Sequence, residues 1–283
     1  MKNPEENTKK KTWPVKAYND AEFLHSPAGR QVRVLCEFEE PKSRFRKYRI
    51  NNTIVFFGSA RILSKSECQK NLRNLKRKTT SLPKMTPTMQ KKFELAERDL
   101  VMSRYYEEAV QLSAKITKWS QKIKDPLRKF YICSGGGPGI MEAANRGAHS
   151  VGGKSIGLNI SLPMEQDPNP YQTRDLSFEF HYFFIRKFWF FYLSKAMIVF
   201  PGGYGTMDEF FELLTLVQTQ KTKKHMPIIL YGKSFWNELL DFDAMQRWGV
   251  ISPEDLKLFK VVDDVDTAFR YLKDELTEHY LNK

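Results

Sequence analysis

Two glycine-rich turns are the parts of the sequence best suited to chemistry. SGGGPG at 134–139 follows an apolar run at 130–133, and PGGYGT at 201–206 follows another at 196–200. A strand that ends in a glycine turn and continues as a helix points unpaired N–H groups and a positive dipole end at a bound anion. We therefore predict a phosphate site at these turns. Neither turn fits the dinucleotide fingerprint G-x-G-x-x-G, so NAD is not favoured.

Thr206 and Glu209 have the Thr-x-x-Glu spacing of a helix capping box. In that interpretation the two side chains only satisfy backbone N–H groups at the start of a helix. Their position favours a functional interpretation, because Glu209 would lie one turn inside the predicted phosphate-binding helix. A carboxylate there can face a sugar carbon that becomes cationic.

An aromatic segment, YFFIRKFWFFY at 182–192, is hydrophobic almost all round. This pattern predicts a helix over about 182–194 that is buried between the sheet and another subunit or domain. Arg186 and Lys187 are costly in such surroundings unless an anion meets at least one of them. They are the best candidates for basic ligands in the chain.

The elements that position these residues alternate between strands and helices. Apolar runs predict strands at 52–57, 130–133, 155–160, 196–200 and 227–231, and periodic segments predict helices at about 100–119, 140–148, 206–219, 234–248 and from 265 onward. This order is typical of an α/β fold with a doubly wound parallel sheet, in which ligands bind beyond the carboxyl ends of the strands. We expect an N-terminal extension at 1–50, mixed helix and loop and partly disordered. A Rossmann-like nucleotide-binding catalytic domain should follow at 51–283, with a basic insertion at about 62–92.

The net positive charge of the protein comes from the first half of the chain. The 283 residues carry a net charge of +13, which divides into +16 for residues 1–130 and −3 for residues 131–283. KRK at 76–78, followed by TTSLP at 79–83, predicts an exposed loop. We interpret this charge as a solvated face and expect no nucleic-acid partner, while contact with a polyanion stays the alternative.

Cysteine, histidine and hydropathy patterns indicate the compartment and whether metal sites or membrane spans are expected. The three cysteines show no C-x-x-C spacing, which suits a reducing compartment, and the five histidines show no metal-ligand spacing, so we expect no metal site. The longest apolar run, 188–193, is far shorter than the roughly 20 residues of a membrane span. The lysine-rich start has no apolar signal core, and we expect a cytoplasmic protein without membrane contact.

Four segments together resemble one known family. They are FGSAR at 57–61, GGGPGIMEAANRGA at 135–148, RK at 186–187 and PGGYGTMDE at 201–209. They resemble the Lonely Guy (LOG) proteins, phosphoribohydrolases long mislabelled as lysine decarboxylases. The resemblance extends from about residue 54 to the C-terminus and is closest to the longer bacterial branch, which also has an N-terminal extension.

The resemblance implies hydrolysis of the N-glycosidic bond of a nucleoside 5′-monophosphate, AMP or a cytokinin nucleotide, to a free base and ribose 5-phosphate. It implies Arg186 and Glu209 as the catalytic pair and no cofactor. Asp208 stands where many members have glutamate. From the turns and the resemblance together, the candidate substrate- and phosphate-binding residues are Gly58, Ser59, Gly135, Gly136, Glu165, Lys187, Gly202, Gly203, Tyr204, Gly205, Thr206 and Thr215.

Two other functions are considered beside hydrolysis. The same fold can bind a nucleotide without turnover and report it to a partner. A lysine decarboxylase would need pyridoxal phosphate on a Schiff-base lysine, and no lysine stands in a recognisable cofactor context. The aromatic segment and the resemblance both favour a homodimer or a larger even oligomer. The alternative is a monomer whose N-terminal extension covers the aromatic surface.

Overall fold

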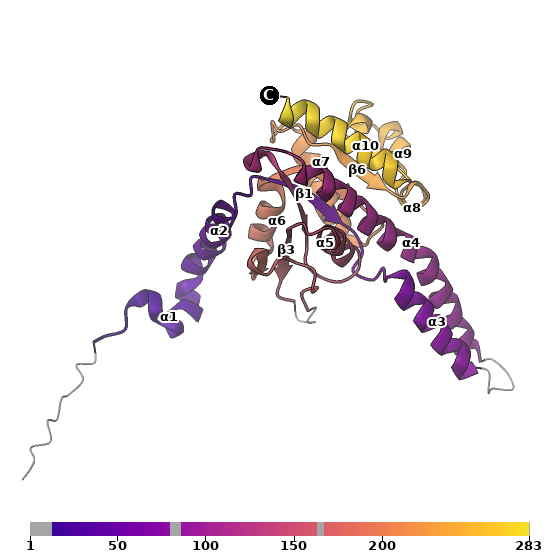
Figure 1. The fold of residues 1–283 in the computed structure, drawn as a ribbon, viewed down its shortest axis with the longest axis horizontal. Coiled ribbons are helices and arrows are strands. Elements are labelled where there is room, and N and C mark those ends of the chain that lie inside the picture. The colour runs from indigo at the N-terminus through magenta and orange to yellow at the C-terminus, as the bar shows by residue number, and fades with distance from the viewer. Residues whose placement is uncertain (1–12, 80–85, 163–166, 283) are drawn as a thin grey trace, which may run out of the picture.

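One sheet of seven parallel strands forms the centre of the protein, in the order β4-β3-β2-β1-β5-β6-β7 (Figure 1). The computed structural model describes residues 13–79, 86–162 and 167–282. The strands are β1 (Asn52–Phe57), β2 (Phe130–Ser134), β3 (Ser155–Ile160), β4 (Ser177–Phe180), β5 (Ser194–Val199), β6 (Ile228–Tyr231) and β7 (Lys260–Val262). The predicted doubly wound parallel α/β fold is confirmed.

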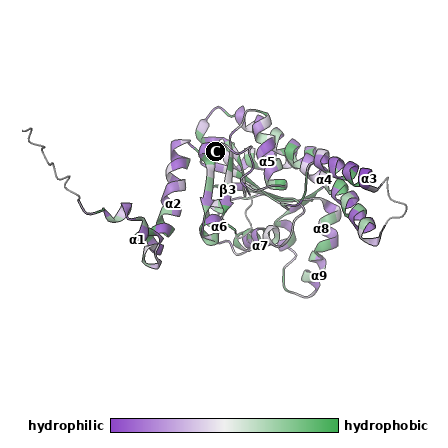
Figure 2. Ribbon diagram, turned by 90° about the horizontal axis from the view of Figure 1, so that it is seen from below, coloured by the Kyte–Doolittle hydropathy of each residue, from purple (hydrophilic) through white to green (hydrophobic). Residues whose placement is uncertain are grey.

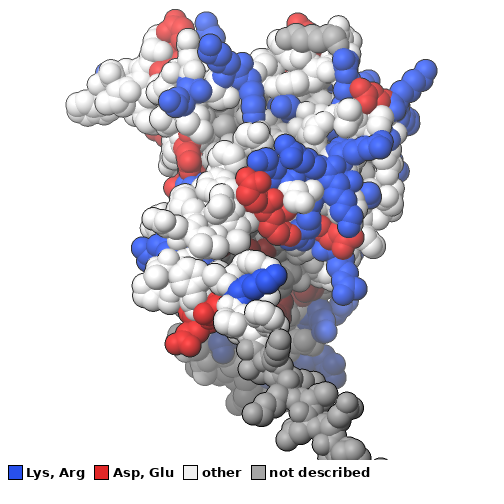
Figure 3. Space-filling view, turned by 90° about the vertical axis from the view of Figure 1, so that its left-hand side faces the viewer, with Lys and Arg blue, Asp and Glu red and all other residues white. Residues whose placement is uncertain are grey.

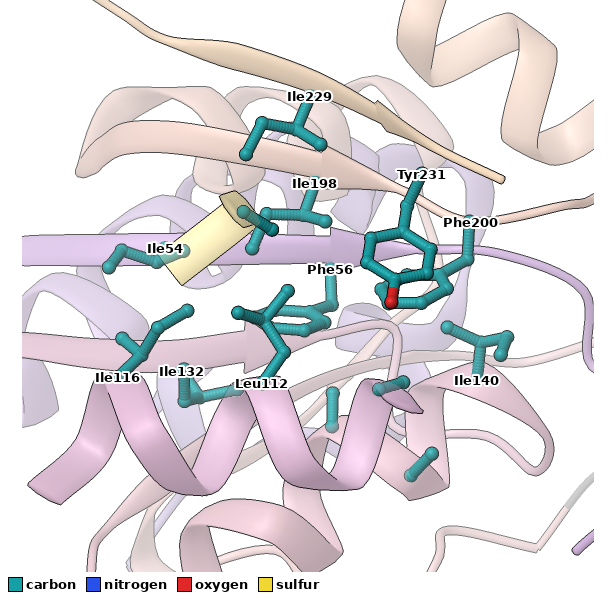
Figure 4. Close-up of a cluster of buried hydrophobic side chains, with 14 of the residues drawn as sticks. Ile54, Phe56, Leu112, Ile116, Ile132, Ile140, Ile198, Phe200, Ile229 and Tyr231 are labelled. Carbon is teal, nitrogen blue, oxygen red and sulfur yellow. The ribbon is translucent and has the colours of Figure 1, made fainter. Parts of the chain in front are cut away.

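The central strands are buried on both faces, which explains their continuous apolar runs. Successive side chains of a strand point to opposite faces, so Ile54 and Phe56 of β1 join one core cluster and Val55 and Phe57 join the other. Figure 4 shows the first cluster, where Ile54 and Phe56 lie beside Leu112 of the covering helix. Each cluster fixes one layer of helices on the sheet.

Helices cover both faces of the sheet. The first core cluster is completed by α4 (Pro87–Gln121), α5 (Ile140–Ser150) and α10 (Val265–Leu276). The second is completed by α2 (Arg30–Lys47), α6 (Phe183–Tyr192), α7 (Tyr204–Gln218) and α8 (Lys233–Leu239). The remaining α-helices of the described residues are α1 (Ala21–His25), α3 (Lys65–Thr79) and α9 (Phe242–Arg247).

The strand order reverses beside β1, and this is where the two glycine turns meet. The chain builds β2, β3 and β4 on one side of β1 and then crosses to β5 on the other. Both turns are hydrogen-bonded to the loop after β1: Ser59 N donates to the oxygen of Pro201 at 2.9 Å, and Ile140 N, directly after the first turn, donates to the oxygen of Ser59 at 3.1 Å. A reversal of this kind leaves a crevice at the carboxyl ends of the strands, which is the usual ligand site of such sheets.

Three secondary-structure predictions were incomplete or wrong. The edge strands β4 and β7 were not predicted, because they are short and include polar residues, whereas β6 is as short as β4 but is a continuous apolar run. The single helix predicted at 234–248 is two helices, α8 and α9, separated by Leu240 and Asp241. Asp241 begins the second helix by accepting a hydrogen bond from Ala244 N at 2.8 Å.

The basic insertion is a helical pair rather than a loop. Figure 1 shows α3 and the first half of α4 projecting together from the body, and Figure 2 shows that α3 is largely hydrophilic. Lys76, Arg77 and Lys78 form the last turn of α3, so the predicted exposed loop is wrong at these positions. Lysine and arginine are good helix formers, and an amphipathic helix also tolerates a run of them. Residues 80–83 of that prediction lie outside the described residues.

The N-terminal extension is tied to the second helix layer. Glu37 of α2 accepts a hydrogen bond from His181 N at 2.8 Å through its carboxylate, and its backbone oxygen accepts one from Trp189 Nε1 at 2.9 Å. Phe45 lies in the second core cluster, 5.3 Å from the Trp189 ring. The division at residue 50 stays a prediction, and the expected disorder concerns residues that lie partly outside the described ranges.

The aromatic helix α6 packs one side against the sheet, and α2 covers part of its other side, where the Phe38 and Phe188 ring centroids lie 5.2 Å apart. Ile185, Trp189 and Phe190 are buried in the second core cluster, whereas Phe184 and Tyr192 are more than half exposed. The burial predicted against the sheet is confirmed. Cover by another subunit, and with it the homodimer or larger even oligomer, stays a prediction.

Charge and hydropathy place no membrane-spanning element in the described part of the chain. None of its helices combines the length and apolar character that a bilayer crossing needs.

On the face viewed in Figure 3, lysine and arginine side chains gather on one side, and a largely uncharged area occupies the other.

Leu112 provides a test of the packing between α4 and the sheet. The Leu112 side chain is fully buried between these layers, so Leu112→Ala should lower the free energy of unfolding by about 2–5 kcal/mol, as measured by urea denaturation. Val101→Ala on the same helix is the matched control, because Val101 is 68% exposed and should change stability little. Equal effects of the two substitutions would contradict the assigned packing.

Candidate active site

A pocket of about 800 Å³ opens at the carboxyl edge of the sheet, where the strand order reverses. Both glycine turns contribute to its wall, as do α6 and α8. The lining residues are Phe57, Gly58, Ser59, Ala60, Arg61, Gly135, Gly137, Met141, Asn159, Ile160, Leu162, Phe183, Arg186, Gly202, Gly203, Tyr204, Gly205, Thr206, Met207, Asp208, Glu209, Phe235 and Leu239. The fold therefore brings together most of the residues that the sequence singled out, including Arg186 and Glu209.

The second glycine turn presents the start of α7 to this pocket. The helix begins at Tyr204, two residues earlier than predicted, and its N-cap Gly203 makes no side-chain capping bond. A Cβ atom built on Gly203 or Gly205 would meet nothing within 4 Å, so the backbone borders open space. Unpaired N–H groups at a helix start attract anions, and this turn has the geometry of a phosphate cradle.

The capping-box interpretation of Thr206 and Glu209 is wrong. Thr206 is the third residue of α7, one turn past the N-cap position that a capping box requires. Its side chain folds back against the turn, where a Cβ at Gly202 would lie 2.1 Å from Thr206 Oγ1. Only glycine leaves room for this approach. Glu209 consequently lies well inside the helix and has no part in capping.

Glu209 is a buried acid with an unsatisfied oxygen. It is 6% exposed, and its Oε2 atom has no hydrogen-bond partner among the residues that the structure describes. Burial raises the pKa of Glu209 to about 7, although the positive charges of Lys187 and Arg186 oppose the shift. A carboxyl group that lines a pocket and titrates near neutral pH is suited to catalysis.

Arg186 is held at the pocket wall by backbone oxygens. Its Nε donates to the oxygen of Leu158 at 2.7 Å, and Nη2 donates to the oxygen of Gly135 at 3.4 Å. A Cβ at position 135 would lie 2.6 Å from Arg186 Nη2, so glycine is needed there for the guanidinium to fit. Burial lowers the pKa of Arg186, and the negative charge of Glu209 opposes this shift. The guanidinium is therefore positioned before any substrate binds.

Lys187 turns to carboxylates rather than into the pocket. Its Nζ lies 2.8 Å from Asp208 Oδ2 and 2.5 Å from Glu212 Oε2, both on α7. Burial alone would lower the pKa of Lys187, but these hydrogen bonds raise it overall. The expectation that an anion must meet the RK pair is thus satisfied for Lys187 by two side chains of the protein itself.

The first glycine turn contributes to the site partly through its carbonyl groups. Gly135 lines the pocket, whereas Gly136 adopts a φ of 75° and is not among the lining residues. The Gly136 oxygen accepts hydrogen bonds from Asn169 Nδ2 at 2.8 Å and from Gln172 Nε2 at 2.7 Å. These amides, which the sequence did not single out, fix the turn beneath the pocket.

Two further predicted nucleotide contacts, besides Lys187 and Gly136, are not placed in the pocket. Thr215 is exposed on α7, its Oγ1 donates to the oxygen of Phe211 at 2.7 Å, and it borders a separate depression with Asp208 and Glu212. Glu165 lies outside the described residues. Their contact roles stay predictions.

Several pocket residues were missed by the sequence reasoning. Arg61 and Asn159 add polar groups, and Met141, Phe183 and Phe235 add apolar ones. Arg61 directly follows the first strand-end turn and Asn159 interrupts an apolar strand, so both left a signal in the sequence. The apolar residues left none, because nothing distinguishes them from core residues until the chain is folded.

Comparison with known proteins identifies relatives of this site. The family described as "Possible lysine decarboxylase" matches residues 141–272, which contain Arg186 and Glu209. The "Pyrimidine/purine nucleotide 5'-monophosphate nucleosidase" of Escherichia coli strain K12 is 33% identical over 165 residues. The "Probable cytokinin riboside 5'-monophosphate phosphoribohydrolase LOGL5" of Oryza sativa subsp. japonica is 31% identical over 126 residues. The resemblance to the Lonely Guy family is confirmed.

The alignments with these relatives are partial. They cover 52% of this chain and 34% of the bacterial enzyme, and 43% of this chain and 49% of the rice protein. The chain thus spans about a third to a half of the length of these relatives. Among solved structures, the molybdenum cofactor binding protein of Rippkaea orientalis is similar, with a TM-score of 0.45 and 17% identity over 79% of this chain and 96% of that one.

The raised pKa of Glu209 predicts a pH-dependent cost in stability. Below its ordinary pKa of 4.5 the carboxyl is protonated in both folded and unfolded chains, and the shift has no effect. As pH rises from 4.5 to about 7, the unfolded chain releases the proton first, so the cost grows to about 3 kcal/mol and is complete above pH 7. Glu209→Gln should therefore gain stability over the wild type between pH 5 and pH 8.

Urea denaturation at both pH values measures this difference. Glu238→Gln on α8 is the control, since Glu238 is exposed and its substitution should leave the pH dependence of stability unchanged. A stability difference between Glu209→Gln and the wild type that stays constant with pH would contradict the buried, unpaired state of Glu209.

Proposed function

We propose that this protein hydrolyses the N-glycosidic bond of a nucleoside 5′-monophosphate, with AMP the first substrate to test, to a free base and ribose 5-phosphate. The observation that carries the proposal is the buried carboxyl of Glu209, whose Oε2 lacks a hydrogen-bond partner in the described part of the chain and which shares one pocket with Arg186 and the uncapped start of α7. The names of the relatives support the reaction class.

The reaction needs negative charge near C1′, where the bond to the base breaks, and positive charge near the 5′-phosphate. The C1′–N bond breaks with its electron pair going to the base, and positive charge builds at C1′. The oxygen of a water molecule adds to C1′, one of its protons is released, and the base nitrogen takes up a proton. The Glu209 carboxylate stabilises the cationic carbon and accepts the water proton. The 5′-phosphate remains attached to the sugar and binds at the start of α7.

Remote binding of the phosphate supplies the energy that positions the sugar. The N–H groups after Gly203 are preorganised, so the anion replaces water there without rearranging the protein. Arg186 adds a fixed positive charge that holds the phosphate or the carboxylate in place. Phe183, Phe235 and Met141 provide apolar surface suited to a flat base.

Lysine decarboxylation fits this pocket poorly, whatever the description of the matching family. Pyridoxal phosphate chemistry needs a lysine that forms a Schiff base. The lining residues that the structure describes include Arg61 and Arg186 but no lysine, and Lys187 is occupied by Asp208 and Glu212. The remaining alternative is a protein that binds the nucleotide without cleaving it.

Release of adenine tests the proposal directly. The purified protein should release adenine from AMP, with kcat/KM at least about 100-fold higher than for adenosine, which lacks the phosphate. Glu209→Gln should lower kcat at least about 100-fold, because it removes the charge that opposes the developing cation. Chromatography of adenine and ribose 5-phosphate measures both.

Glu238→Gln, an exposed change on α8, is the matched control and should keep wild-type turnover. Calorimetric titration of AMP into Glu209→Gln separates binding from chemistry, and binding should change by only a few fold. A wild type that binds AMP without cleaving it would show a nucleotide sensor instead. A Glu209→Gln variant with full activity would refute the catalytic role of this carboxyl.

The pH profile of kcat/KM provides a second test. Glu209 works as a carboxylate, so activity should fall as pH decreases through its pKa of about 7, approaching tenfold per pH unit. The second proton of the substrate phosphate titrates near pH 6 and affects only the lower part of the profile. Residual activity of Glu209→Gln should be flat between pH 6.5 and 8. A wild-type profile that is also flat in this range would contradict the assignment.

A further inference from the structure

Three side chains with metal-binding atoms meet at the edge of the sheet opposite the pocket. His225 lies in the connection between α7 and β6, just before the amino end of β6, and Glu275 lies in the last turn of α10. His279 lies in the π-helical turn Thr277–Leu281 that continues α10. The group is therefore separate from the carboxyl edge where Arg186 and Glu209 are found.

The three side chains converge on one carboxylate oxygen. His225 Nε2 lies 2.5 Å from Glu275 Oε2, and His279 Nε2 lies 4.0 Å from the same atom. The three potential ligand atoms lie within 4.8 Å of one another. The two imidazole rings are stacked, with centroids 3.6 Å apart and an angle of 22° between their planes. All three side chains are partly exposed, so the group is open to solvent.

A hydrogen bond between His225 and Glu275 explains only part of this arrangement. His279 directs the same ring nitrogen at the same oxygen from 4.0 Å, which is too long for a hydrogen bond. The helix widens to π geometry over the turn that carries His279, a feature often found at functional sites. The Tyr280 hydroxyl donates to the backbone oxygen of His225 and ties this turn to the connection before β6.

Two imidazole nitrogens and one carboxylate oxygen form a donor set suited to zinc. Tetrahedral zinc with bonds of about 2.0–2.2 Å holds neighbouring ligand atoms about 3.3 Å apart. The longest separation exceeds this by about 1.5 Å at most, and the separation between His225 Nε2 and Glu275 Oε2, 2.5 Å, is shorter than it. Rotation of these partly exposed side chains can make both adjustments. We propose that His225, Glu275 and His279 bind one Zn²⁺ ion, with water in the fourth position.

Charged side chains around the three residues affect how tightly a Zn²⁺ ion can bind. Glu275 supplies one negative charge, whereas Lys195 and Lys224 add positive charge to this region. The Lys224 ammonium is turned to the backbone oxygens of Phe191 and Tyr192, and Lys195 lies 5.3 Å above the Tyr280 ring. Neither amine is paired with Glu275 in these contacts, which leaves its carboxylate for the ion.

Zinc at this position would add to the stability of the folded chain. It would cross-link the C-terminal helix to the connection before β6, and these segments are held here by side-chain contacts that are partly exposed to solvent. An ion that binds only the folded chain stabilises it in proportion to the logarithm of its concentration over Kd.

Zinc binding by the full chain, freed of any affinity tag and of metal by chelation, tests the proposal. Calorimetric titration with ZnCl2 should show one ion per chain, and zinc should raise Tm. Co²⁺ should give the visible absorption of a tetrahedral site. His279→Ala and Glu275→Gln should each weaken zinc binding at least tenfold and abolish the Tm increase.

His25→Ala and Glu278→Gln are the matched controls, one an exposed histidine outside the cluster and the other an exposed glutamate in the same π-helical turn. Both should bind zinc as the wild type does. Glu275→Gln preserves the side-chain shape, so it gives an answer even if His279→Ala fails to fold. Absence of binding at millimolar zinc, or equal binding by Glu275→Gln and the wild type, would overturn the proposal. Neither outcome depends on AMP hydrolysis.

Discussion

A carboxyl group held out of water without a hydrogen-bond partner costs free energy, and Glu209 is such a group at the centre of the pocket. Packing of the second helix layer offsets this cost. Phe210 and Leu213 of α7 are buried in the core and fix the rotation of the helix about its axis. With those two side chains directed into the core, the Glu209 side chain is directed along the helix start into the pocket. The free energy that burial of the Glu209 carboxyl costs is therefore linked to the rise of its pKa to about 7.

The pocket exists because three loops from distant parts of the chain are joined at the reversal of strand order. Hydrogen bonds from Ser59 to Pro201 and from Ile140 to Ser59 connect the loops after β1, β2 and β5. Close packing makes glycine necessary at this junction, since a Cβ at Gly139 would lie 2.3 Å from the oxygen of Ser59. The turns therefore serve two purposes, since they present helix starts to an anion and allow the loops to interlock.

The sequence was sufficient to predict the parts of this protein that follow local rules. Continuous apolar runs revealed five of the seven strands, and the turns at 134–139 and 201–206 revealed where the site would form. Local rules fail for β7, whose three residues form a strand only because β6 offers a partner. They also fail for Asn169, a buried residue in a polar loop whose Nδ2 atom donates to partners more than 20 residues earlier in the chain. His225 and His279, 54 residues apart, could not be connected by spacing at all.

Charge balance around α7 gives Arg186 a role that the geometry alone does not show. Lys187 is already shared between Asp208 and Glu212, so its charge is largely neutralised by these two carboxylates. A substrate phosphate at the helix start adds further negative charge, which raises the pKa of Glu209 and favours its inactive, protonated form. Arg186 is the other cation whose charge opposes the raised pKa of Glu209, and backbone oxygens hold it in place. Under the proposed reaction, Arg186 keeps Glu209 ionised while the anionic substrate is bound, so the two residues depend on each other.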